Sequence, residues 1–332
     1  MQRYSGTTYI EKAIIKGTGK RLFGILPIIS TVAGLVYRSV SKDMHLADSF
    51  ESKTIKSTSE KILNEYKATQ GNNLPAYFQR GKGQYPTHVP LFLHERAILF
   101  VGSAIGSLLY PENNNYIVTL GETSATNKFL IELRNKMLND ENGRLILRNK
   151  PHLTSTTLHL KELENYPKKS FGYHYFKWLS KNKVSPDTRV PVKFIDDAEL
   201  AYVFQRYRET HDFVHTLLDM PVSREGEIAI KWFEWLHFGV PFAGMGAIFA
   251  PWNVKTLNER ERLFNIYYPI MLENAINLQR GKICLVNFNW EKILHEDIDL
   301  FREKIGIKLG PDMKKLRKLQ ITNWQQVKQL DL

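Results

Sequence analysis

Two histidines and an aspartate within one helical turn are the residues of this sequence best suited to chemistry. The segment HDFVH holds His211, Asp212 and His215, and Glu227 follows after eleven intervening residues. Residues four apart lie on one face of a helix, so His211 and His215 can direct two imidazoles at one point. Asp212 is rotated about 100° from His211 and about 60° from His215. Imidazole nitrogens and carboxylate oxygens bind divalent metals, so the pattern predicts a metal site with these four residues as ligands.

The residues around this segment predict the helix that carries it. Asp196 and Glu199 have the D-x-x-E spacing of a capping box. Apolar residues then recur at steps of three and four and place the histidines on the apolar side of the helix: Leu200, Phe204, Tyr207, Val214 and Leu218. Pro221 ends the helix.

A second helix is predicted to begin near Ser223 and to carry Glu227. Glu234 lies seven residues after Glu227, on almost the same face. It is therefore a candidate second carboxylate for delivering a proton during catalysis.

Other interpretations of the motif stay open on these residues alone. A histidine on an apolar face is commonly a core residue whose polar atoms are satisfied. A zinc protease motif of the H-E-x-x-H type needs a glutamate where Asp212 stands. An HD-type phosphohydrolase needs an additional upstream histidine and a distant aspartate, and no spacing here identifies them.

Composition limits the class of protein. The chain has 332 residues, 43% of them hydrophobic and 24% charged, which is ordinary for one large globular domain or two small ones. Its one cysteine, Cys284, excludes an internal disulfide. The net charge is +12, but no nucleic-acid-binding motif accompanies it, so we expect no nucleic-acid partner.

Half of the excess positive charge lies in residues 1–42, which hold seven Lys or Arg and one acid. A basic, acid-poor, hydroxyl-rich start is typical of a mitochondrial transit segment. Leu22 to Tyr37 is an uncharged run of sixteen residues, slightly short for a membrane span of about 20. A membrane anchor is therefore the second interpretation. We expect the mature chain to begin between residues 25 and 45.

Residues 43–332 are predicted to form a single all-α domain, with the metal site between two of its helices. Leu91 to Tyr110 predicts a helix, Leu120 to Met137 a second, and Ser170 to Leu179 a helical part of the core. No alternating pattern is long enough for a sheet. Gly239 to Trp252 is uncharged and rich in small residues, which allows close helix packing. Its role is a core helix, a dimer contact or a wall for an apolar ligand.

Longer segments of the chain carry a resemblance to a known family. They are HVPL at His88, LGETSA at Leu120, SFGYHYFKWL at Ser170, SPDTRVPVKFIDD at Ser185, RYRETHDFVHTLLDMP at Arg206, GEIAIKWFE at Gly226 and VNFNWE at Val286. Over roughly residues 45–320 the chain resembles the mitochondrial coenzyme Q biosynthesis protein 4 family in its fungal form. The family pattern H-D-x-x-H, then Glu after eleven residues, maps onto His211, Asp212, His215 and Glu227.

The resemblance implies an all-α fold and a divalent metal, usually zinc (Zn²⁺). It implies a peripheral position on the matrix side of the mitochondrial inner membrane, within a multi-protein ubiquinone-synthesis complex. It also implies loss of the ring carboxylate from a 4-hydroxy-3-methoxy-5-polyprenylbenzoate lipid. The alternative is a non-catalytic scaffold that binds polyprenyl lipid and organises the complex.

Overall fold

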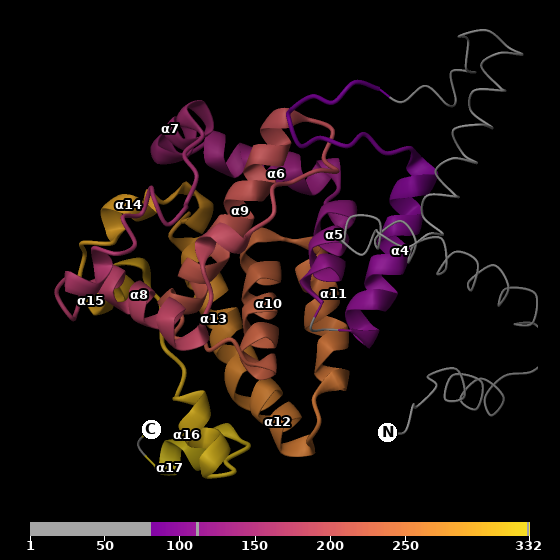
Figure 1. Ribbon diagram of the computed structural model, residues 1–332. Helices are drawn as coiled ribbons and strands as arrows, with labels where there is room; N and C mark the ends of the chain where they lie inside the picture. The colour runs from indigo at the N-terminus through magenta and orange to yellow at the C-terminus, as the bar shows by residue number, and fades with distance from the viewer. Residues whose placement is uncertain (1–80, 111–112, 331) are drawn as a thin grey trace, which may run out of the picture. The chain divides into compact units, whose positions relative to one another are not determined.

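The computed structural model describes residues 81–110, 113–330 and 332, and these residues are all-α (Figure 1). Within them, strand-like pairing is limited to one antiparallel bridge between Ser170 and Asp297. The helices are α4 (Leu93–Leu109), α5 (Asn114–Ser124), α6 (Asn127–Leu138), α7 (Glu141–Asn149), α8 (Phe171–Asn182), α9 (Ala198–Leu217), α10 (Arg224–Phe238), α11 (Pro241–Phe249), α12 (Leu257–Arg262), α13 (Tyr268–Arg280), α14 (Trp290–Ile293), α15 (Ile298–Ile305), α16 (Met313–Lys318) and α17 (Trp324–Gln329). The all-α prediction is confirmed, and the predicted transit segment, 1–42, lies outside the described residues.

The chain divides into two compact units. The described part of the first is residues 92–106, most of α4. The second comprises residues 81–91 and 107–332, and it contains the buried hydrophobic core and the predicted metal ligands. None of the helices in the described part of the chain combines the length and apolarity needed to cross a membrane.

Helix α9 is buried along most of its length, with α6, α7 and α8 packed around it. Asp197 caps its N-terminus: the carboxylate accepts hydrogen bonds from the backbone N–H of Glu199 at 2.9 Å and of Leu200 at 2.8 Å. The predicted capping box at Asp196 was therefore wrong by one residue. The Asp196 carboxylate instead lies 3.2 Å from His88 Nε2, because the loop before α4 packs there.

The link from α9 to α10 is fixed at both ends. Arg302 of α15 donates hydrogen bonds to the carbonyls of Thr216 and Leu217 at 3.0 and 2.9 Å, and so binds the C-terminal end of α9. Ser223 caps α10, because its side chain accepts from the Gly226 N–H at 3.2 Å. The prediction of a second helix starting near Ser223 is confirmed.

The segment LGETSA ends α5 and does not open a helix to Met137 as predicted. Ala125 is extended and stops the helix. Thr126 then caps α6 by accepting from the Phe129 N–H at 3.3 Å. The break leaves Glu122 in the last turn of α5, where its carboxylate ion-pairs with Arg208 of α9.

The small residues of α11 allow it to pack closely along α10. A Cβ atom at Gly244 would lie 2.8 Å from Trp235 Nε1, and one at Gly246 would contact the Lys231 side chain at 3.5 Å. Ile248 and Phe249, at the C-terminal end of α11, are exposed. Gly244 therefore serves helix packing, the first of the roles predicted for the Gly239–Trp252 run, whereas a Cβ atom at Gly246 would make an ordinary contact.

A buried neutral histidine makes the stability of this fold depend on pH. His237, in the last turn of α10, accepts a hydrogen bond from the Leu285 N–H at 3.2 Å. Burial, with a smaller contribution from Lys136, lowers the pKa of His237 from 6.5 to about 3. Between these two values the unfolded chain binds a proton that the folded chain does not, so stability falls as the pH falls through this window.

We expect His237→Gln to remove this contribution, because a glutamine oxygen can accept the same bond without titrating. The parent should lose about 2 kcal/mol more than the variant between pH 8 and pH 5. Urea unfolding of both proteins at the two pH values measures the difference. The same pH dependence in both proteins would contradict the assignment.

Candidate metal centre

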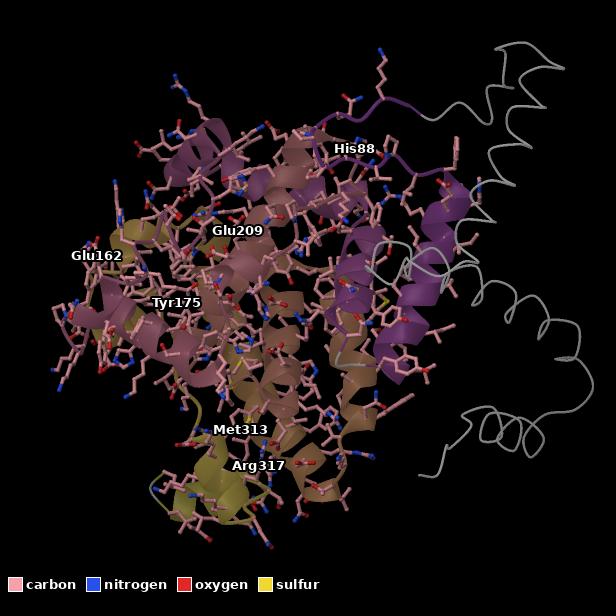
Figure 2. The ribbon with its side chains drawn as sticks, in the orientation of Figure 1. His88, Glu162, Tyr175, Glu209, Met313 and Arg317 are labelled. Carbon is pink, nitrogen blue, oxygen red and sulfur yellow. The ribbon has the colours of Figure 1, made fainter. Side chains whose placement is uncertain are left out.

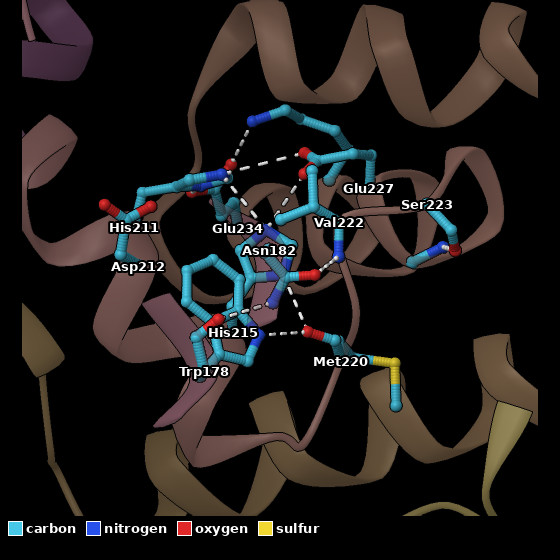
Figure 3. Close-up of polar contacts among 12 residues, drawn as sticks. Trp178, Asn182, His211, Asp212, His215, Met220, Val222, Ser223, Glu227 and Glu234 are labelled. Atoms are coloured by element: carbon cyan, nitrogen blue, oxygen red, sulfur yellow. Dashed lines mark hydrogen bonds and ion pairs between the residues drawn. The ribbon is translucent and has the colours of Figure 1, made fainter. Parts of the chain in front are cut away.

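Three electron-pair donors meet between α9 and α10 (Figure 3). His211 and His215 come from α9 and Glu227 from the first turn of α10. The two Nε2 atoms are 3.2 Å apart, and the Glu227 carboxylate lies 3.2 Å from His215 Nε2 and 3.7 Å from His211 Nε2. One ligand atom from each residue lies within 4.8 Å of the others.

The opposite ring nitrogens determine how the two imidazoles are protonated. His211 Nδ1 lies 2.7 Å from Glu234 Oε1, and His215 Nδ1 lies 3.1 Å from the Met220 carbonyl. A carboxylate and a carbonyl accept hydrogen bonds, so this network assigns a proton to each Nδ1. In neutral rings, two Nε2 lone pairs then face one another and the Glu227 carboxylate. An electron-rich cluster of this kind needs a cation, either a proton or a metal ion.

The pKa shifts of His211 and Glu227 also favour a positive charge in this cluster. Burial disfavours the imidazolium of His211, but Glu234 and Glu227 outweigh it and raise the pKa of His211 above its ordinary value. Burial would raise the pKa of Glu227, but His215 and His211 hold it well below its ordinary value. Glu227 is therefore anionic at neutral pH, as a metal ligand must be.

Glu234 lies behind His211, on the side away from Glu227. It is fully buried, and its second oxygen accepts a hydrogen bond from Lys231 Nζ at 2.7 Å. Burial would raise the pKa of Glu234, but Lys231 and His211 lower it below its ordinary value. A carboxylate in this position orients a metal-binding histidine and increases its basicity. Proton delivery by Glu234 stays a prediction.

Asp212, the fourth predicted ligand, makes a different contact. Its carboxylate is buried and ion-paired with Arg189, with 2.5 Å between Oδ1 and Nη2. Figure 3 shows this carboxylate turned away from the three donors. The structure thus brings three of the four predicted ligands together and pairs the fourth with an arginine.

Several residues at the site were not found from the sequence. Trp178 of α8 has its ring centroid 5.0 Å from that of His215, and it donates to the Met220 carbonyl at 2.8 Å. Lys231 was also missed, although its position four residues after Glu227 puts it on the same helix face. Arg189 lies in a loop, where no periodicity signals a contact.

The site reaches the surface at Glu227. The His215 side chain is fully buried, that of His211 is 15% exposed and that of Glu227 is 36% exposed. Three protein ligands with one accessible side would leave a bound metal open to water or substrate, as in catalytic sites.

Comparisons place this chain among known proteins. The family model described as "Coenzyme Q (ubiquinone) biosynthesis protein Coq4" matches residues 85–311. The chain is 47% identical over 316 residues to "Ubiquinone biosynthesis protein COQ4, mitochondrial" of Komagataella phaffii, covering 95% of this chain and 99% of that protein. It is 44% identical over 294 residues to the protein of the same name from Candida tropicalis, covering 88% and 90%. A putative ubiquinone biosynthesis protein from Nostoc punctiforme matches with a TM-score of 0.46 and 16% identity, covering 64% of this chain and 97% of that chain.

We expect Glu234→Gln to weaken binding of a divalent metal by about 10- to 100-fold. The amide keeps an oxygen for His211 Nδ1 but loses the negative charge that makes His211 a better ligand. Competition with a chromophoric chelator measures the affinity, and Glu132→Gln, on the exposed face of α6, is the matched control. Equal affinities in both variants would show that Glu234 does not act on the site.

Proposed function

The chain belongs to the coenzyme Q (ubiquinone) biosynthesis protein Coq4 family, and from this membership we propose that it is a metal-dependent decarboxylase in ubiquinone synthesis. The reaction removes the carboxylate at ring C1 of a 4-hydroxy-3-methoxy-5-polyprenylbenzoate. One observation carries the proposal: the Nε2 atoms of two imidazoles and a carboxylate meet at a place open to the surface.

The donor set fits Zn²⁺ or another divalent metal. His211, His215 and Glu227 would hold it, and Asp212 would be a fourth ligand if it left Arg189. A cation bound here supplies Lewis-acid stabilisation of negative charge on a substrate carboxylate or phenolate oxygen. The chain's own groups prepare the site, because Glu234 and the Met220 carbonyl hold protons on the Nδ1 atoms and leave both Nε2 atoms free.

The substrate's own chemistry provides the route for the electrons. Its 4-hydroxyl is para to the carboxylate, so ionising that hydroxyl moves electron density onto the carbon that bears the carboxylate. A proton then adds to this carbon, the bond to the carboxylate breaks, CO₂ leaves, and the electrons of that bond restore the aromatic ring with hydrogen in place of the carboxylate. An oxidative version would need dioxygen activated elsewhere or a metal other than Zn²⁺, because Zn²⁺ has no redox chemistry. Glu234 is the candidate for moving the proton, because its carboxylate contacts both Lys231 Nζ and His211 Nδ1.

A non-catalytic scaffold that binds polyprenyl lipid and organises the other coenzyme Q biosynthesis proteins is the second candidate. Exposed apolar side chains on α11 and on the 3₁₀ helix that follows it (Ala250–Asn253) favour this candidate. Ile248 is 50% exposed and Trp252 is 70% exposed. An exposed apolar surface of this kind suits a lipid, the inner-membrane surface, a second copy of the chain or a neighbouring protein.

Purified protein decides between the two candidates. The parent, prepared with defined metal and given substrate with and without dioxygen, should hold about one metal per chain and release the decarboxylated product. The His211→Ala, His215→Ala double variant should lose both, since two imidazole ligands are gone. Asp212→Asn should keep more metal, because the Asp212 carboxylate pairs with Arg189 and is not among the three donors. His159→Ala, at an exposed histidine, is the control.

Two outcomes would count against parts of the proposal. Unchanged metal content in the double variant would rule out the site. If the metal-loaded parent releases no decarboxylated product either with or without dioxygen, the result would favour the scaffold.

We further propose that the protein is mitochondrial, peripheral on the matrix side of the inner membrane, and imported by a transit segment at residues 1–42. The names of the curated relatives support the organelle. N-terminal sequencing of protein from mitochondria should find a start between residues 25 and 45. Intact Met1 in most of the mature protein would contradict the cleavage.

A further inference from the structure

The first turn of α10 is held on the side opposite the metal ligands. Glu225 and Glu227 are two residues apart, so their side chains point about 200° apart around the helix. Glu227 faces α9, whereas Glu225 faces α12 and α16. The Glu225 side chain is 2% exposed, which is unusual for a glutamate in the first turn of a helix.

Two arginines bind Glu225, one at each carboxylate oxygen. Arg262 of α12 donates its Nε–H and an Nη2–H to Oε1 at 3.2 and 2.9 Å. Arg317 of α16 donates its Nε–H to Oε2 at 3.1 Å and an Nη2–H to the same oxygen. The three side chains form one charge-assisted cluster that joins α10, α12 and α16.

The C-terminal segment that supplies Arg317 is anchored at further points. Met313 of α16 lies with its sulfur 3.7 Å from the hydroxyl of Ser223, which caps α10. The Tyr267 hydroxyl donates to the Pro311 carbonyl at 2.9 Å. Figure 2 shows Met313 and Arg317 together on α16, near α12. The segment thus contacts both the cap and the first turn of α10.

On the other side, the link between α9 and α10 packs directly against the first turn of α10. A Cβ atom at Gly226 would lie 2.1 Å from the Pro221 carbonyl oxygen. The same link is bonded to His215 through the Met220 carbonyl. The position of Glu227 is therefore set from two directions, by this link and by the arginines on Glu225.

We propose that Arg317 is a positioning residue for the metal centre: through Glu225 it immobilises the first turn of α10 and so holds Glu227 against His211 and His215. This inference rests on the proposed metal-binding function. The first turn of a helix has N–H groups without intrahelical acceptors and opens readily. Of the three donors, Glu227 is the one carried by such a turn, so its position needs this restraint.

Arg317→Gln in the full chain tests the inference, because the Arg317 side chain is 46% exposed and its replacement leaves no cavity in the core. The matched control is Lys318→Gln, which removes the same charge from an exposed position of the same helix. In metal-free protein, hydrogen exchange of residues 224–230 should be faster in Arg317→Gln than in the control. Zn²⁺ affinity should fall about tenfold, and the absorption bands of bound Co²⁺ should shift.

Arg317→Lys keeps the charge but loses the second donor nitrogen, and it should fall between parent and Arg317→Gln. If Arg317→Gln does not fold, the same measurements on Arg317→Lys test the inference. Unchanged exchange, or unchanged Zn²⁺ affinity and Co²⁺ spectrum in a folded variant of Arg317, would overturn the inference and leave the proposed function intact. A parent that binds no metal would overturn the proposed function, and the inference with it.

Discussion

The 3.2 Å approach of the His211 and His215 Nε2 atoms is the constraint on which this structure depends. Two lone pairs and a carboxylate repel one another there, and the buried His215 side chain is shielded from the water that would weaken this repulsion. The chain holds them there through contacts on their outer sides. Glu234 and the Met220 carbonyl fix the two rings. Wherever the positive charge comes from, these outer contacts determine where it must sit.

The polar character of α9 follows from the same constraint. A helix that carries ligands in the middle of a protein must bury much of its polar surface, and each buried group then needs a partner. Arg208 pairs with Glu122 of α5, and Asp212 pairs with Arg189. Glu209 accepts from the Leu153 N–H at 3.0 Å. These pairs connect the ligand helix to the segments around it.

The local features of the site could be predicted from the sequence, whereas its long-range contacts could not. The four-residue spacing of His211 and His215 determines their common face, and Ser223 has the side chain of a helix cap. The cap of α9 was placed at Asp196, because the sequence does not show that His88 binds this residue. Glu225 looks like an ordinary first-turn acid. Its arginine partners lie 37 and 92 residues away, and no periodic pattern spans such distances.

The short link between α9 and α10 has a consequence for the order in which the protein assembles. All three donors lie within residues 211–227, so the loop that must close to bring them together is small and its entropic cost is low. Short loops of this kind close quickly. Arg317, in contrast, is synthesised 92 residues after its partner Glu225. During synthesis on the ribosome, His211, His215 and Glu227 are therefore all present well before Arg317. The helices at the C-terminus are the last to be made, and they supply the arginine that holds the first turn of α10.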